Sequence, residues 1–299
     1  MDKRKGGLCP FLVFLQLKDS LTLINIIMGI VPGTEELRKQ FFILQKKYQP
    51  FIDILTNKQD FYRKEYKYKG FNASPSILIY RPKILFLAYN PSGGKDWKEL
   101  RDNLPINPHL DETQLMFFDK WAARKGEWYQ LNKSVNNPFP RKIVDLLYEL
   151  ASLIYPDKNN EKGTNKKPFW AMDLDNSLMS MMFLNLYPIA TPNGNTLISL
   201  CKRLCLEENI PECCKKYEWN LRKYMVDIMR QMVALIEPKI VVCMGSQTFH
   251  DYTKTKRCGH SLHEILSTPN FPDVIGFSRR GAWESNIPNI AKEIHNRII

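Results

Sequence analysis

Short apolar runs alternate with amphipathic stretches along most of this chain, and this alternation constrains the fold more than any other feature. Four runs are almost continuously apolar: "KILFLAYN" (83–90), "MMFLN" (181–185), "KIVVCMGS" (239–246) and "DVIGF" (273–277). Such runs are typical of strands buried on both faces, and a helical period marks the stretches between and after them: 111–129, 141–155, 218–238 and 286–298. The alternation predicts a three-layer α/β/α sandwich, with helices on both faces of a central, mainly parallel, four-stranded sheet.

The chain that precedes the first buried run has a different character. A helix is predicted over 35–59, with Thr34 as its N-cap. The next segment, "FYRKEYKYKG" (61–70), interleaves aromatic with basic residues. It fits either a surface that stacks bases and contacts phosphates or an edge strand kept soluble by lysines. We therefore divide the chain into a helical, basic N-terminal extension (1–75) and an α/β domain (76–299).

The charge balance indicates a polyanionic partner. Lys and Arg number 43 against 31 Asp and Glu, a formal net charge of +12. Such an excess favours nucleic acid ahead of an anionic membrane surface. Lys18 and Asp19 interrupt the first apolar stretch, and the runs on either side are too short for a bilayer. We expect a cytoplasmic monomer that does not enter a membrane.

The seven cysteines are odd in number and unevenly spread, which argues against the disulfide framework of a secreted protein. Four of them are close in sequence: Cys201, Cys205, Cys213 and Cys214. Their spacing fits no standard pattern of metal or iron–sulfur ligands, and buried structural thiols are the favoured interpretation. We expect no metal and no cofactor.

Polar residues follow three of the four predicted strands directly. They are Asn90-Pro91-Ser92 after the first strand, Asn185 at the end of the second, and Ser278-Arg279-Arg280 after the fourth. Function collects at the carboxyl ends of the strands in sheets of this kind, so we expect these residues to converge at one edge.

This order of motifs resembles the uracil-DNA glycosylase superfamily. "ILFLAYNPSGG" (84–94) is similar to the strand and water-activating motif of that superfamily, and "MMFLNLYPIATPNG" (181–194) to the strand that carries its base-reading asparagine. "MVALIEPKIVVCMGSQTF" (232–249) is similar to its helix-Pro-Lys-strand-Gly segment. The resemblance covers about residues 80–299. It implies a monofunctional DNA glycosylase without a cofactor, acting on duplex DNA with a flipped nucleotide.

The resemblance also implies roles for individual residues. Asn90 would orient the attacking water, although an amide is too weak a base to take its proton, and Asn185 would pair with the polar edge of the flipped base. Ser278, in the stretch that corresponds to the last motif of the superfamily, is the third residue assigned to catalysis. The substrate-binding set is Tyr89 as a stacking residue, Pro91, Ser92, Gly93 and Tyr187, and the DNA-binding set is Lys95, Arg279 and Arg280.

Two departures from the superfamily bear on the substrate. The stretch Gly276-Phe277-Ser278 stands where the superfamily usually has His-Pro-Ser, so the histidine that stabilises the departing base is missing. Ser92, followed by glycines, replaces a tyrosine that excludes 5-substituted pyrimidines. The open position favours a 5-substituted pyrimidine, such as a glucosylated hydroxymethyl-cytosine in phage DNA, as the target of an antiviral defence enzyme.

Two alternatives remain open. The first is a repair glycosylase that excises uracil, and the second is a catalytically silent relative that only binds DNA. Ser92 and its glycines also fit a phosphate-binding nest instead of an open pocket. A nucleotide hydrolase is a third class, but the chain lacks the Gly-rich phosphate loop, with its lysine and Ser/Thr, that such an enzyme requires.

Overall fold

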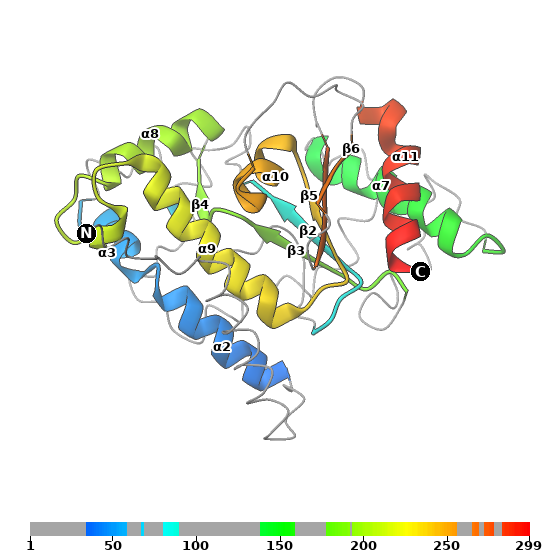
Figure 1. Ribbon diagram of the computed structural model, residues 1–299, viewed down its shortest axis with the longest axis horizontal. Coiled ribbons are helices and arrows are strands. Elements are labelled where there is room, and N and C mark those ends of the chain that lie inside the picture. Colours follow the sequence, from blue (N-terminus) through cyan, green and yellow to red (C-terminus); the bar gives the residue numbers. More distant parts are fainter. Residues whose placement is uncertain are drawn as a thin grey trace, which may run out of the picture.

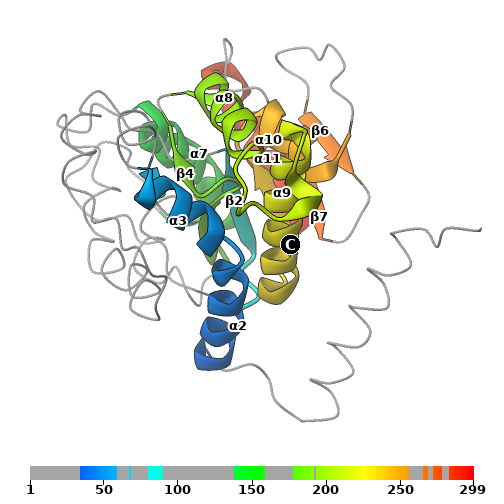
Figure 2. The ribbon, with the colours of Figure 1, turned by 90° about the vertical axis from the view of Figure 1, so that its left-hand side faces the viewer.

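The main sheet has the strand order β3-β2-β5-β7-β6 (Figures 1 and 2). The computed structural model describes residues 34–58, 67–68, 80–89, 138–158, 178–191, 193–255, 265–268, 272–277 and 283–299. The strands of the sheet are β2 (Ile84–Ala88), β3 (Met181–Asn185), β5 (Ile240–Cys243), β6 (Ile265–Thr268) and β7 (Asp273–Phe277). The pairs β3–β2, β2–β5 and β5–β7 are parallel, and β6 is antiparallel to β7.

The α/β class is therefore confirmed, but the sheet has five strands instead of the predicted four. The fifth strand, β6, has the sequence Ile-Leu-Ser-Thr, and its Leu266 is buried whereas Ser267 is exposed. A short strand at the edge of a sheet needs only one apolar face, so it lacks the continuous apolar run that marks the central strands.

The strand residues alternate between two hydrophobic cores. Leu85 and Leu87 of β2 belong to the core on one face, and Ile84 and Phe86 to the core on the other. The first core is covered by α2 (Thr34–Lys46), α3 (Gln49–Asn57), α8 (Gly194–Leu204), α9 (Glu218–Ile236) and α10 (Ser246–Thr253). The second is covered by α7 (Pro138–Ile154) and α11 (Trp283–Ile298). Figures 1 and 2 show α7 and α11 across the sheet from α9.

The predicted helices at 141–155, 218–238 and 286–298 correspond to α7, α9 and α11. The predicted helix at 111–129 lies outside the described residues. A one-turn 3-10 helix, Glu212–Cys214, separates α8 from α9. Within the described ranges, no helix combines the length and the hydropathy that crossing a bilayer requires.

The segment predicted as one helix at 35–59 forms two helices, α2 and α3. Pro50 stands in the first turn of α3, where its missing N–H is tolerated, and a continuous helix would have had to accommodate it internally. Both helices pack in the core that contains α9, where Phe41, Tyr48 and Phe51 are fully buried. The Tyr48 hydroxyl donates a hydrogen bond to the carbonyl oxygen of Met225 in α9 (3.2 Å). The boundary at 75/76 stays a prediction, and the described helices before it share one core with the sheet.

A second, two-stranded sheet joins two distant parts of the chain. Strand β1 (Lys67–Tyr68) is antiparallel to β4 (Ile189–Ala190), with Lys67 opposite Ala190 and Tyr68 opposite Ile189. The aromatic and basic segment 61–70 therefore contributes a strand, as one of its two interpretations predicted, and its other residues lie outside the described part of the chain.

Candidate functional site

The four parallel strands end at one edge of the sheet. Asn185 is the partner of Ala88, and Cys243 is the partner of both Leu87 and Gly276. The chain runs from β2 to β3 on one side and then crosses over β2 to reach β5 on the other. In open α/β sheets, ligands bind outside the carboxyl ends of the strands, at the point where the strand order reverses in this way. That point lies at the end of β2.

The structure describes three of the predicted site residues and brings them together. Tyr89 follows β2, Asn185 ends β3, and Tyr187 lies two residues further along. The remaining predicted residues lie outside the described ranges: Asn90, Pro91, Ser92, Gly93, Lys95, Ser278, Arg279 and Arg280. Their roles stay predictions.

Asn185 is buried at the junction of the two strands, with 2% of its surface exposed. The pairing of β2 with β3 continues beyond it, because the amide of Leu186 donates to the carbonyl of Ala88 (2.8 Å) and that of Tyr187 to the carbonyl of Tyr89 (3.0 Å). A buried side-chain amide is costly unless its polar atoms are paired, so the surroundings of Asn185 must supply polar partners.

The rings of Tyr89 and Tyr187 pack edge to face, with centroids 5.0 Å apart and an interplanar angle of 73°. Their exposed fractions are 7% and 0%. Tyr89 also meets α8, where a Cβ added to Gly194 would lie 3.3 Å from Cε1 of Tyr89. A base stacks only on an exposed ring face, so in this conformation the two tyrosines support the site rather than stack on a ligand.

Tyr187 belongs to a buried polar cluster that the sequence did not predict. The Tyr187 hydroxyl donates to Oδ2 of Asp251 (2.7 Å), and Nη1 of Arg222 donates to the same oxygen (3.0 Å). The Gln247 amide donates to Oδ1 of Asp251 (2.6 Å). The side chains of Arg222 and Asp251 are only 11% and 7% exposed, so this is a buried ion pair.

Arg222 has further partners on its own helix, α9. Its Nε donates to the Glu218 carboxylate (3.1 Å), and its guanidinium lies 4.6 Å from the centroid of the Trp219 ring. The signal that sequence analysis overlooked is positional: Arg222 falls on the apolar stripe of the helix, three and four residues before Met225 and Val226, both fully buried. A charge on a buried stripe requires a buried partner.

The charges in this cluster determine its protonation. Burial raises the pKa of the Tyr187 hydroxyl well above its ordinary value, and the nearby Asp251 carboxylate raises it further. Burial alone would lower the pKa of Arg222, but the facing Tyr187 and Asp251 raise it overall. Tyr187 therefore stays a protonated donor and Arg222 a cation, so this pair holds geometry rather than exchanging protons at neutral pH.

The Tyr89 hydroxyl lies at the edge of the same cluster. It is buried, and it makes no hydrogen bond of normal geometry with the described residues. Burial raises its pKa above the ordinary value, Asp251 raises it further, and Arg222 lowers it. Tyr89 therefore remains neutral beside the ion pair.

The predicted cysteine cluster is mainly internal. Cys201, Cys205 and Cys214 are buried and Cys213 is exposed, with its Sγ 3.6 Å from that of Cys214. Burial raises the pKa of the Cys201 and Cys214 thiols, which keeps them protonated. Among the described residues, no group of three or more His, Cys, Asp or Glu side chains is placed to hold a metal ion.

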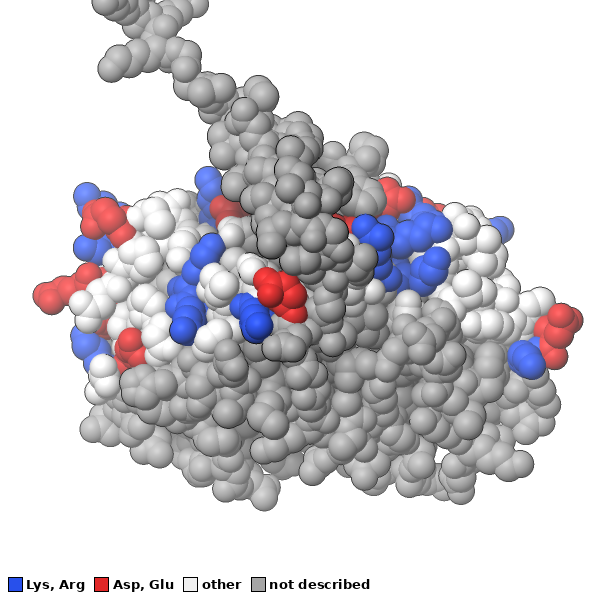
Figure 3. Space-filling view, turned by 90° about the horizontal axis from the view of Figure 1, so that it is seen from below, with Lys and Arg blue, Asp and Glu red and all other residues white. Residues whose placement is uncertain are grey.

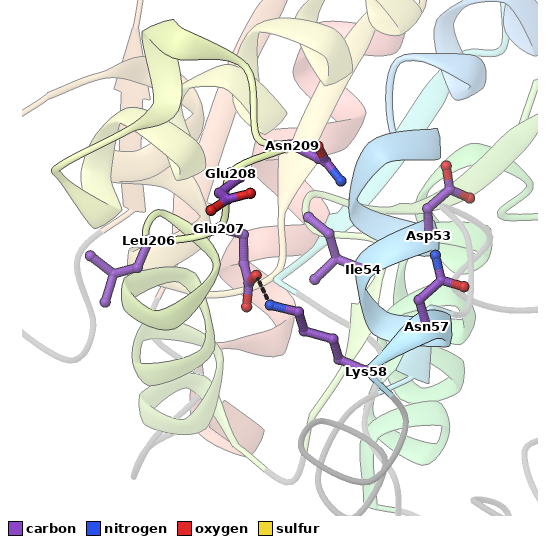
Figure 4. A pocket seen from close by; sticks show the side chains of 8 residues that line it. All are labelled: Asp53, Ile54, Asn57, Lys58, Leu206, Glu207, Glu208 and Asn209. Carbon is purple, nitrogen blue, oxygen red and sulfur yellow. Dashed lines mark hydrogen bonds and ion pairs between the residues drawn. The ribbon is translucent and has the colours of Figure 1, made fainter.

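A pocket of about 330 Å³ opens elsewhere, between α3 and the turn after α8 (Figure 4). An ion pair between Lys58 and Glu207 spans it. Its lining is Asp53, Ile54, Asn57, Lys58, Leu206, Glu207, Glu208 and Asn209, and none of the predicted site residues is among them. The pocket therefore does not belong to the site at the sheet edge.

On the described part of the face that Figure 3 shows, basic side chains form no single stripe but stand in separate groups beside acidic ones. Ion pairs such as Arg81 with Glu237 and Lys254 with Asp227 are examples of this mixing on the described surface.

Comparison with protein families and with curated proteins identifies no relative of this chain. No protein-family model matches the chain, and no curated protein matches it at a significant level.

Proposed function

We propose that this chain is a DNA glycosylase, a divergent member of the uracil-DNA glycosylase superfamily, that flips and excises a 5-substituted pyrimidine and leaves an abasic site. The observation that carries the proposal is the position of Asn185. It is buried at the carboxyl end of β3, paired with the end of β2, and β2 leads through Tyr89 to Asn90. Asn185 at the end of β3, and Asn90 two residues along the sequence from the end of β2, match the order of motifs that the superfamily uses.

We also infer the finer architecture of the fold. The two hydrophobic cores on opposite faces of the sheet support a three-layer α/β/α arrangement around the four parallel strands. In this arrangement β6 is an addition at the edge beside β7.

The proposed reaction requires the site at this edge of the sheet to perform two functions. Cleavage of an N-glycosidic bond makes the sugar cationic and the base anionic, so a water must be held below the sugar and donors must face the base. Asn90 orients the water, and Asn185 offers one donor and one acceptor to the polar edge of the base. Ser278 completes the catalytic set after β7. An asparagine orients water without taking its proton, which predicts a slow enzyme.

The substrate-binding roles follow from the resemblance. Pro91, Ser92 and Gly93 would lie beside the 5-position of the pyrimidine and leave room for a substituent. Tyr89 and Tyr187 support the site from beneath, which revises the stacking role expected for Tyr89. Lys95, Arg279 and Arg280 grip the phosphates of the DNA, and the net charge of +12 is consistent with such a partner. We expect the protein to act as a cytoplasmic monomer without a cofactor.

Abasic-site formation tests the proposal. Wild type, Asn90→Ala and the control Asn209→Ala, which alters an exposed asparagine remote from the sheet edge, are incubated with plain DNA, uracil-containing DNA and phage DNA that carries glucosylated hydroxymethyl-cytosine. We expect abasic sites only in the modified phage DNA, lost in Asn90→Ala and retained in Asn209→Ala. Product on uracil instead would identify a repair enzyme. Tight, salt-sensitive binding without product on any DNA would refute catalysis in favour of a silent DNA-binding relative.

A further inference from the structure

We propose that Asp251 and Arg222 are positioning residues that hold the end of β3 against the end of β2 through Tyr187, and so fix Asn185 in the site. This inference rests on the proposed function for its catalytic readout alone. The three residues come from separate elements: Tyr187 follows β3, Arg222 lies in α9 and Asp251 in α10. We call them the positioning network.

The first step is the way in which the network restrains Tyr187. One carboxylate oxygen, Oδ2 of Asp251, accepts from both the Tyr187 hydroxyl (2.7 Å) and the Arg222 guanidinium (3.0 Å). Hydrogen bonds to a charged group are stronger than neutral ones, and their strength increases with burial. Because Tyr187 is fully buried, its ring has no room to take another direction without breaking these contacts.

The second step is how Tyr187 restrains the strand ends. Its amide donates to the carbonyl of Tyr89 (3.0 Å), and its ring packs on that of Tyr89. Tyr89 immediately precedes Asn90, and Asn185 lies two residues before Tyr187. Asn185 is therefore only two residues away from the residue that the network restrains. A displacement of about 1 Å in reacting groups can cost on the order of 100-fold in rate.

Glu218 supplies a matched control for Asp251. Both carboxylates pair with Arg222, through Nε and Nη1 respectively, but of the two only Asp251 is bonded to Tyr187. Asp251→Asn and Glu218→Gln each neutralise one carboxylate that pairs with Arg222. We expect kcat for base excision to fall about 10-fold in Asp251→Asn with KM unchanged, and both to stay within about twofold in Glu218→Gln. An equal loss in the two variants would reduce the role to support of Arg222 and overturn the inference.

Tyrosine hydroxyls allow a second comparison if Asp251→Asn folds poorly. Tyr187→Phe removes only the hydroxyl bonded to Asp251, and Tyr48→Phe removes another buried hydroxyl, bonded to Met225 in the same core. The inference requires a loss of kcat in Tyr187→Phe that Tyr48→Phe does not show. Equal kcat in the two variants would contradict it.

Hydrogen exchange tests the same inference without any activity. The amides of Leu186 and Tyr187 are followed relative to that of Val242 in β5, which reports general opening of the sheet. We expect them to exchange at least about 10-fold faster in Asp251→Asn and Tyr187→Phe than in Glu218→Gln and Tyr48→Phe. If wild type forms no abasic site in any DNA, the proposed function fails and this measurement alone decides the inference. Unchanged relative exchange would refute it.

Discussion

The hydroxyl of Tyr187 lies 2.7 Å from Oδ2 of Asp251, although the two residues are 64 positions apart in the chain. The contact links the end of β3 to α10, a helix that begins after β5. It therefore joins two segments that follow strands on opposite sides of β2. In our proposal, the support of the candidate site depends on this link.

Replacement of Asn185 tests its role in reading the base. We expect Asn185→Ala to lower abasic-site formation at least about 100-fold, because removal of a buried donor and acceptor leaves the polar edge of the base unpaired. The free energy of unfolding should fall by about 1–3 kcal/mol, the usual cost of removing a buried hydrogen-bonding group. Product analysis and urea unfolding measure the two effects. Unchanged excision would exclude Asn185 from the reaction.

Gly276 tests the packing of β7 against α10. A Cβ at this position would lie 2.5 Å from the Cβ of Phe249, which is attached to the backbone of α10 and cannot move alone. We expect Gly276→Ala to destabilise the protein by about 1–3 kcal/mol or more. Gly194→Ala is the control: its Cβ would meet two ring atoms of Tyr89, at 3.3 and 3.8 Å, and alanine favours the helix, so the change should stay within about 1 kcal/mol. Urea unfolding of both variants compares them.

The N-terminal helices can be tested by truncation. Phe41, Tyr48 and Phe51 are fully buried in the core that contains α9. A fragment of residues 76–299 would expose the apolar face of α9 that these side chains cover. Each Å² of apolar surface that is exposed costs about 25 cal/mol of folding free energy. We expect it to lose cooperative thermal unfolding, whereas a fragment of residues 34–299 retains it. Circular dichroism melting distinguishes the two, and a cooperative transition in the shorter fragment would show that α2 and α3 are dispensable.

Alkaline pH should destabilise the protein. Burial raises the pKa of Tyr252 above its ordinary value of 10.0 and that of the Cys243 thiol above 9.0. The folded protein therefore holds these protons more tightly than the unfolded chain does. Their contribution is fully present below the unfolded-state pKa values and is lost as the pH rises above about 9 and then 10 toward the folded-state values. The urea midpoint should fall over this range, and less steeply in Tyr252→Phe. A midpoint that is independent of pH would contradict the buried placement.

Arg279 and Arg280 test the proposed grip on DNA. If each neutralises a phosphate, then Arg279→Ala and Arg280→Ala should each lower the slope of log K against log salt by about 1. Fluorescence anisotropy at several salt concentrations measures the slope. Lys58→Ala, in the pocket at α3, is a control that should leave it unchanged. A slope unaffected by either arginine variant would assign the phosphate contacts to other basic residues.

The sequence alone determined the elements whose side chains carry a complete pattern. The strands β2, β3, β5 and β7 are buried almost entirely, so each appears as a continuous apolar run, and α9 appears as an amphipathic period. The end of β3 at Asn185 could be placed to the residue, because the polar amide interrupts the apolar run there.

Only the tertiary structure decided the rest, because it depends on contacts between residues far apart in the chain. The edge strand β6 has too short a pattern to be seen without its partner β7. Asp251 resembles a surface charge of its helix, with Gln247 four residues before it, until the fold buries it against Tyr187. Arg222 lies on an apolar stripe and so requires a buried partner, but only the fold identifies Asp251 as that partner. Tyr89 was expected to face a base, but its ring is enclosed by Tyr187 and α8. Local sequence specifies which side chains are apolar, whereas burial of a polar group depends on the partner that packing brings to it.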